Sequence, residues 1–143
     1  MALRSLSERI FQTIAFEAGG VVLAAPVYAL IFGASAAESL AFIAVLSVAV
    51  MIWSPLHNTV FDVLDWRLNQ RLASDRPHGL RLVHAFSHEV TTLIVTLPIV
   101  MVWTRLGLWQ ALLLDLGLSA FYAAYAYLFH LAYDRLRPVQ VTR

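Results

Sequence analysis

The chain has 143 residues, of which 60% are hydrophobic and only 13% are charged, and its mean hydropathy is +0.73. Because soluble domains carry roughly 25% charged residues, this composition excludes an ordinary water-soluble domain. The absence of cysteine excludes disulfide frameworks and thiolate metal sites. The formal net charge of +1 says little, but the apolar composition predicts the lipid bilayer, and no nucleic acid, as the main partner.

Four long apolar stretches predict four bilayer-spanning helices, each long enough for the roughly 20 residues that a span requires. We expect these helices at about residues 10–33, 39–61, 82–104 and 109–133. Short links join the first two and the last two, and a longer polar link, residues 62–81, lies between the pairs. The predicted fold class is therefore an all-α membrane protein, a four-transmembrane-helix bundle.

The distribution of arginine predicts how the bundle is oriented. All ten basic residues are arginines, and only Arg105 falls on the side of the two short links. The other nine lie on the side of the termini and the long link: Arg4, Arg9, Arg67, Arg71, Arg76, Arg81, Arg135, Arg137 and Arg143. Because basic residues concentrate in cytoplasmic loops, we expect both termini in the cytoplasm.

The two halves of the chain match each other at an offset of 72 residues, without gaps. The matched pairs are Arg9 and Arg81, Glu17 and Glu89, Pro26 and Pro98, Leu40 and Leu112, Ser47 and Ser119, Phe61 and Tyr133, and Asp62 and Asp134. Duplication explains matches at Arg, Glu, Pro and Asp better than chance does. We predict two transmembrane pair repeats, residues 1–72 and 73–143, that enter the membrane in the same direction.

Three carboxylates, Glu17, Glu89 and Asp115, fall inside predicted spans, where charge is costly. Glu17 and Glu89 lie about 12 Å inside the bilayer, and Trp53 and Tyr125 lie about 13 Å inside it on the same count of 1.5 Å per residue. Anions and aromatic faces at one depth favour a site for a lipophilic cation. The predicted substrate-binding residues are Phe16, Glu17, Trp53, His57, Asn58, Glu89, Tyr125 and His130.

A buried carboxylate can hold either a proton or a cation, and this exclusion is the chemical basis of antiport. We expect Glu17 to couple proton and substrate, with Glu89 and Asp115 as further titratable groups in the membrane. Two alternatives stay open, because His84 and His88 could satisfy Glu89 locally and Asp115 could pair with Arg105.

The remaining predicted roles are structural. Asp62 and Asp134 stand beside arginines at helix ends and are expected to form interfacial ion pairs. Arg9 and Arg81 are expected to be structural residues at the membrane interface. Pro26 and Pro98 each remove a helix hydrogen bond at matching depths, as gating hinges or as packing features.

Several motifs together resemble one known family. The segment Arg81-Leu-Val-His84-Ala85-Phe86-Ser87-His88-Glu89, with its degenerate copy at residues 9–17, is similar to the RxxHAxxFE motif of the proteobacterial antimicrobial compound efflux family. Residues 53–62 resemble that family's WNxxFNxxFD motif, residues 114–118 its LDxGL segment, and residues 125–134 its tyrosine-rich YD motif. Four positions depart from the pattern, namely Gln12, Ser54, His57 and His88.

The resemblance implies a chlorhexidine efflux transporter built from two bacterial transmembrane pair units in the inner membrane of a bacterium. Members export cationic biocides, dyes or short diamines in exchange for protons, so the chain is expected to be no enzyme and to need no cofactor. The essential helix-1 glutamate of the family corresponds to Glu17.

Two other functions remain in competition with transport of organic cations. One is a non-transporting membrane assembly subunit, and the other is a metal-ion carrier that uses His84, His88 and Glu89. A same-orientation homodimer is also an expectation, since small residues on the last helix let helices approach each other: Ser119, Ala120, Ala123 and Ala124.

Overall fold

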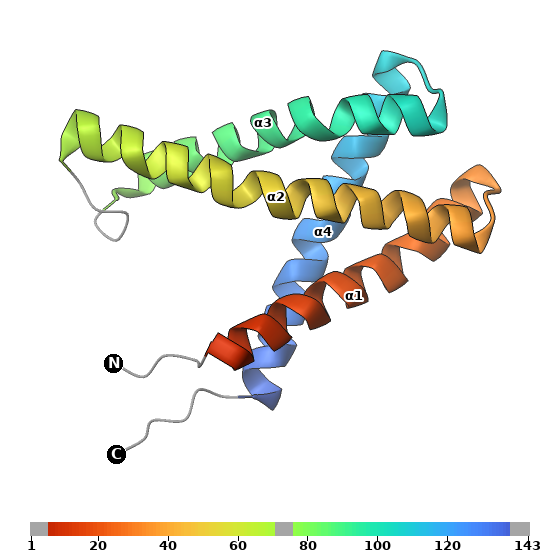
Figure 1. The fold of residues 1–143 in the computed structure, drawn as a ribbon, viewed down its shortest axis with the longest axis horizontal. Helices are drawn as coiled ribbons and strands as arrows, with labels where there is room; N and C mark the ends of the chain where they lie inside the picture. The colour runs from red at the N-terminus through yellow and green to blue at the C-terminus, as the bar shows by residue number, and fades with distance from the viewer. Residues whose placement is uncertain (1–5, 71–75, 138–143) are drawn as a thin grey trace. The chain divides into compact units, whose positions relative to one another are not determined.

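Four α-helices make up the chain in the computed structural model, which describes residues 6–70 and 76–137 (Figure 1). They are α1 (Leu6–Phe32), α2 (Ala36–Asn69), α3 (His78–Thr104) and α4 (Leu108–Leu136). All four are long and apolar enough to cross a membrane, and no strand occurs in the described ranges. The predicted all-α four-helix membrane fold is therefore confirmed.

The helices extend beyond the spans predicted from hydropathy. α2 continues to Asn69 although its apolar stretch ends near residue 61, and α3 begins at His78 instead of near residue 82. A helix does not end where its side chains become polar, because its backbone hydrogen bonds continue into the region of the membrane surface. Hydropathy detects only the apolar part of such a helix and therefore predicts a shorter element.

The two short links are tight turns with left-handed backbone positions. Gly33 follows α1 with φ +63°, a conformation that glycine adopts without steric cost. Ser35 then begins α2 by accepting a hydrogen bond at Oγ from the Glu38 amide at 3.2 Å. Arg105 caps α3 with φ +57°, and its amide donates to the Met101 carbonyl at 2.9 Å.

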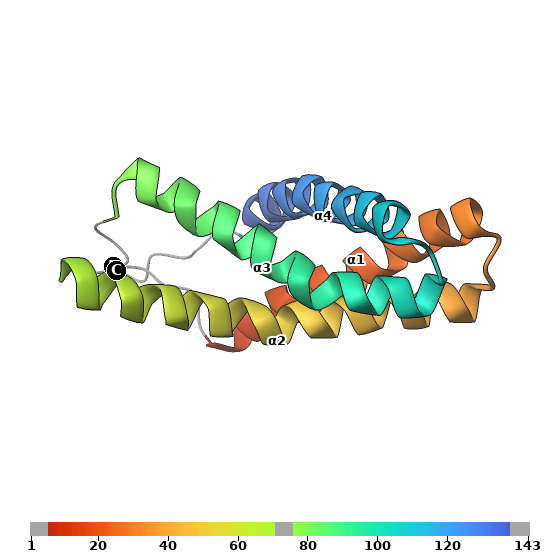
Figure 2. The same ribbon diagram turned by 90° about the horizontal axis from the view of Figure 1, so that it is seen from above.

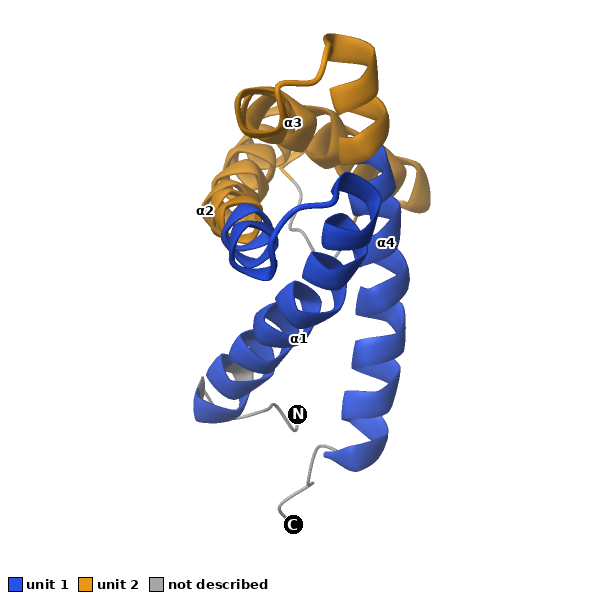
Figure 3. Cartoon of the chain, turned by 90° about the vertical axis from the view of Figure 1, so that its right-hand side faces the viewer, with its two compact units in different colours: residues 1–44, 116–143 blue, residues 45–115 orange. Residues whose placement is uncertain are grey.

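The chain divides into two compact units (Figure 3). Unit 1 comprises residues 1–44 and 116–143, so it holds α1, the start of α2 and most of α4. Unit 2 comprises residues 45–115 and holds the rest of α2, all of α3 and the start of α4. Each unit thus combines helices from both sequence repeats, and the boundary of those repeats near residue 72 stays a prediction.

Within each unit, pairs of long helices supply the contacts. In unit 2, α2 and α3 run side by side in opposite directions, as the two views of Figures 1 and 2 show. Val100 and Ala111 are fully buried there. In unit 1, the buried Tyr28 ring packs on Phe32 and Phe42, with ring centroids 4.7 and 4.5 Å away.

Most large apolar side chains lie on the surface of the chain. Leu30 is 86% exposed and Val102 is 81% exposed, although both lie inside candidate spans. Such surfaces are unfavourable in water and are ordinary against lipid tails, which are as apolar as leucine. The exposure of these side chains therefore fits a protein whose outer surface faces the hydrocarbon of a bilayer.

Candidate functional site

Unit 1 contains a group of stacked rings, which we call the ring cluster: Phe16 of α1 with Tyr125, Phe129 and His130 of α4. The Phe16 ring stacks on Tyr125 at a centroid distance of 5.0 Å and on His130 at 5.6 Å. Phe129 meets Phe16 edge to face at 5.3 Å. Offset and edge-to-face pairs of this kind hold ring faces in fixed directions.

Two adjacent glycines of α1 make room for the tyrosines of α4. A Cβ atom at Gly19 would overlap the Tyr125 hydroxyl oxygen, and one at Gly20 would lie 2.7 Å from the Tyr122 ring. The hydroxyl of Tyr125 therefore reaches the α1 backbone and donates to the Phe16 carbonyl oxygen at 2.9 Å. Sequence reasoning missed both glycines, although small residues inside an apolar span are a known signal of close helix packing.

Glu17 lies beside this ring cluster. Its side chain is half-buried, it follows Phe16 directly in α1, and it interacts electrostatically with Tyr125. On the same face, the Gln12 side-chain amide donates to His130 Nδ1 at 3.1 Å. Unit 1 thus brings together four predicted site residues, Phe16, Glu17, Tyr125 and His130.

Unit 2 contains three histidines in contact, which we call the imidazole cluster: His57 of α2 with His84 and His88 of α3. The His57 ring lies 5.2 Å from His84 and 5.1 Å from His88 between centroids. Each imidazole also has a neutral polar partner on the facing helix. His57 Nε2 contacts Ser87 Oγ at 3.1 Å, His84 Nε2 contacts Asn58 Oδ1 at 3.0 Å, and His88 Nε2 contacts Ser54 Oγ at 3.0 Å.

Trp53 and Glu89 lie next to the imidazole cluster. The Trp53 indole N–H donates to Thr91 Oγ1 at 3.2 Å, which ties α2 to α3 one turn from His57. Glu89 is half-buried, follows His88 directly and interacts electrostatically with it. His84 and His88 take Asn58 and Ser54 as hydrogen-bond partners, and within the described ranges neither histidine forms a hydrogen bond to Glu89.

Asp115 is a buried carboxyl group, only 4% exposed, near the start of α4. Thr96 Oγ1 donates to Asp115 Oδ2 at 2.7 Å, and Thr96 itself is 3% exposed. The sequence suggested Arg105 as a partner, but the hydrogen bond of Asp115 goes to threonine. Glu89 also interacts electrostatically with Asp115, so two of the predicted titratable groups influence each other within unit 2.

The contacts of the two units are equivalent under the 72-residue offset. Phe16 and Phe129 meet edge to face at 72°, and their counterparts His88 and His57 meet at 84°. The contact between Gln12 and His130 corresponds in the same way to that between His84 and Asn58. The first helix of one repeat therefore packs on the second helix of the other repeat in the same register in both units.

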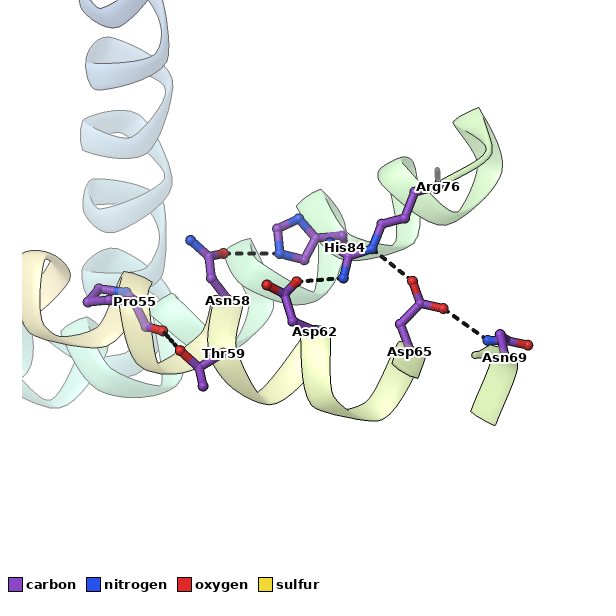
Figure 4. Close-up of polar contacts among 8 residues, drawn as sticks. All are labelled: Pro55, Asn58, Thr59, Asp62, Asp65, Asn69, Arg76 and His84. Atoms are coloured by element: carbon purple, nitrogen blue, oxygen red, sulfur yellow. Dashed lines mark hydrogen bonds and ion pairs between the residues drawn. The ribbon is translucent and has the colours of Figure 1, made fainter. Parts of the chain in front are cut away.

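Ion pairs lie at one end of each unit. In unit 2, Arg76 bridges Asp62 and Asp65, and its Nε donates to Asp65 Oδ2 at 2.9 Å (Figure 4). Hydrogen bonds to Asp65 and Asp62 raise the pKa of Arg76 above its usual value, so the guanidinium stays charged. In unit 1, Glu8 accepts a hydrogen bond from the Tyr133 hydroxyl at 2.6 Å and pairs with Arg137 at 3.3 Å.

The remaining predicted structural residues lie around these pairs. Asp62 forms the expected ion pair, Arg81 Nε donates to the Arg76 carbonyl at 3.0 Å, and Asp134 is exposed on α4. The side chain of Arg9 lies outside the described part of the chain. Within the ranges that the structure describes, no three His, Asp or Glu side chains are arranged to hold a metal ion.

Pro26 and Pro98 lie inside α1 and α3, at equivalent places in the two repeats. Pro55 is a third internal proline, in α2, to which the sequence reasoning gave no role. The Thr59 hydroxyl donates to the Pro55 carbonyl at 2.7 Å (Figure 4).

Comparison with known proteins adds independent findings. A family model described as chlorhexidine efflux transporter matches the chain twice, at residues 4–67 and 76–139. Both limits of the second match follow those of the first by 72 residues (76 − 4 and 139 − 67), which confirms the repeat. No solved structure shows a significant match to the chain.

Relatives with assigned functions match most of the chain. A short-chain diamines transporter of Vibrio parahaemolyticus is 29% identical over 133 residues, which is 92% of this chain and 91% of that protein. One from Acinetobacter baylyi is 28% identical over 64% of this chain and 62% of its own length. One from Acinetobacter baumannii is 23% identical over 90% of this chain and 86% of its own length.

Proposed function

Because this chain belongs to the family of chlorhexidine efflux transporters, we propose that it exports organic cations in exchange for protons, with Glu17 as the coupling group. The substrates are lipophilic cationic biocides and dyes or short-chain diamines, the class named for the relatives. The protein sits in the bacterial inner membrane with both termini in the cytoplasm, an orientation that the arginine distribution supports.

The observation that carries this proposal is the arrangement of rings beside Glu17 in unit 1. A cation over the face of an aromatic ring gains about 0.5–2 kcal/mol, most when water is excluded. Phe16 and Tyr125 are stacked rings of this kind, and Tyr125 lies within electrostatic range of the Glu17 carboxylate. The ring cluster therefore suits a delocalised or alkyl cation, with Glu17 supplying the countercharge.

Exchange follows from the chemistry of one carboxylate in a poorly hydrated place. A bound cation stabilises the ionised form of Glu17, and a proton on Glu17 removes the countercharge that the cation needs. Binding of one therefore releases the other. The membrane potential adds about 2.3 kcal/mol per 100 mV for each net charge that moves.

Trp53, Asn58 and Glu89 of unit 2 are proposed as a second part of the substrate path. Asp115 has a different proposed role, as a titratable group that receives protons from the outer side of the membrane, opposite the cytoplasm. We also propose that two copies of the chain in the same orientation associate through the small residues of α4.

The experiment that tests the function uses the purified chain in proteoliposomes that hold a pH-sensitive dye. Chlorhexidine and 1,4-diaminobutane are added separately, and the protons released on addition of each cation are measured. The protein releases protons with at least one of the two cations, and Glu17→Gln abolishes that release. Glu38→Gln, the same change at an exposed position outside the site, keeps it. Undiminished release by Glu17→Gln would overturn the assignment.

A further inference from the structure

The imidazole cluster of unit 2 contains a buried nitrogen atom that has no hydrogen-bond partner. His57 is only 7% exposed, and its Nδ1 atom bonds to no group among the residues that the structure describes. Buried polar atoms are nearly always paired, since an unpaired one costs the full desolvation of that group. The exception at His57 therefore calls for a chemical explanation.

The neighbouring hydrogen bonds fix which nitrogen of His57 carries the proton. Ser87 has one hydroxyl proton, and it donates that proton to the His84 carbonyl at 3.0 Å. Ser87 Oγ must then accept at its 3.1 Å contact with His57, so His57 Nε2 is the donor. A neutral imidazole carries a single N–H, and the free Nδ1 atom of His57 is consequently an unprotonated acceptor.

His84 is held in the same tautomer. The Asn58 side-chain oxygen accepts at 3.0 Å from His84 Nε2, which leaves Nδ1 of His84 unprotonated in the neutral ring. The ring of His57 touches the rings of both His84 and His88. In its neutral form each of the three imidazoles has one unprotonated nitrogen that can accept a proton, and the other two rings both contact His57.

We propose that His57, His84 and His88 form a proton-binding site, in which His57 Nδ1 takes up the proton. Uptake adds one N–H bond and one positive charge to the cluster, while His57 Nε2 keeps its bond to Ser87. The proposal rests on the proposed function for its part in transport, where it supplies a proton site separate from Glu17. Proton binding itself does not depend on the role of Glu17.

The charged groups that face the cluster come from both helices and from the link between them. Asp62 of α2 and Arg76 before α3 act electrostatically on His84, and Glu89 of α3 acts on His88. Asp62 and Glu89 favour charge on the cluster, whereas burial, the neighbouring imidazoles and Arg76 oppose it. Arg76 is itself paired with Asp62 and Asp65. A proton held by the cluster therefore lies near the paired charges of Asp62 and Arg76 at His84 and near the Glu89 carboxylate at His88.

Comparison of the two units favours a chemical role over a packing role. Phe129 and Phe16 stand where unit 2 has His57 and His88, and they meet edge to face in the same way. Phenylalanine thus satisfies the packing of this framework, and the imidazoles add hydrogen bonds to Ser87 and Ser54 together with the capacity to bind a proton. A proton is also the ligand that fits best, because a fully enclosed Nδ1 leaves no surface for a larger donor such as an alkylammonium group.

The test is nitrogen NMR of the full chain in detergent micelles, with ¹⁵N-labelled histidine, between pH 8.5 and pH 5. The expected result is one imidazole, absent from the spectrum of His57→Phe, whose Nδ1 is unprotonated at high pH and gains a proton on acidification. In His57→Phe the titration midpoints of His84 and His88 also shift, because a neighbour that carries charge has been removed. His78→Gln removes an exposed histidine outside the cluster and leaves these titrations unchanged.

Two results would overturn the proposal. One is a His57 Nδ1 signal that stays unprotonated over the whole range, and the other is identical His84 and His88 titrations with and without His57. If His57→Phe does not fold, the polar variant His57→Gln identifies the His57 signal by its loss instead. Glu17→Gln keeps the coupled titrations, so failure of the imidazole cluster and failure of the Glu17 assignment are distinguished.

Discussion

Replacement of Gly19 by alanine tests whether the placement of Tyr125 determines cation binding. The new Cβ would overlap the Tyr125 hydroxyl oxygen but would lie 3.4 Å from the ring carbon Cζ, an ordinary close contact. The phenol must therefore move, and it loses both its hydrogen bond to the Phe16 carbonyl and its stacking on the Phe16 ring.

The free energies indicate a larger effect on binding than on folding. Loss of the hydrogen bond costs about 0.5–1.5 kcal/mol and loss of the ring pair about the same. Alanine in place of glycine inside a helix returns about 1 kcal/mol, so the net loss of stability is about 0–2 kcal/mol. Loss of one cation–π face of about 0.5–2 kcal/mol weakens cation binding by about 2-fold to 30-fold.

Calorimetric titration of the purified protein with chlorhexidine measures this loss, and thermal unfolding checks the fold. Gly117→Ala is the matched control, because a Cβ there meets nothing within 4 Å. Tyr125→Phe removes the atom that clashes, so Gly19→Ala combined with Tyr125→Phe binds as tightly as Tyr125→Phe alone. The reasoning is refuted if Gly19→Ala binds as tightly as Gly117→Ala, or if the double variant binds as weakly as Gly19→Ala.

Two further predictions concern the buried polar groups of unit 2, and denaturant-induced unfolding in micelles measures both. Arg76→Ala leaves the Asp65 side chain, which is 1% exposed, without its cation, and lowers the free energy of unfolding by about 3 kcal/mol. Asp62→Asn changes a side chain that is 52% exposed and lowers it by at most about 1 kcal/mol. Equal losses for these two variants would contradict this ranking. Thr96→Val removes the donor to Asp115 and costs about 1–2 kcal/mol, while Thr92→Val, at an equally buried hydroxyl with no partner in the described chain, is neutral or stabilising. A loss for Thr92→Val as large as that for Thr96→Val would show that the bond to Asp115 contributes nothing.

The number of helices, their approximate bounds and the repeat follow from sequence because each depends on local composition. Apolar length identifies a span wherever it packs, and a gapless match between Glu17 and Glu89 or Pro26 and Pro98 needs no tertiary information.

The pairing of helices could not be predicted in this way. The spans are apolar on all faces, so no periodicity indicates which face meets which helix. Helix α1 packs on α4 through Gly19 and Tyr125, and α2 packs on α3 through His57 and Ser87. Both pairings depend on the shape of the side chains and on single hydrogen bonds. The sequence predicts Glu17, Trp53, His57 and Tyr125 as site residues, but Ser87 and Thr91, the partners of His57 and Trp53, carry no signal in one sequence.

The exchange of partners between repeats bears on how such a chain arises. A single two-helix repeat contributes its first helix to one unit and most of its second helix to the other, so on its own it completes neither of them. An unduplicated ancestor forms these contacts only as a dimer, whose assembly depends on its concentration in the membrane. Fusion of the copies makes that association intramolecular. Fusion also lets the two units diverge, so that unit 1 has phenylalanine rings where unit 2 has imidazoles. Two identical products of one gene cannot diverge in this way.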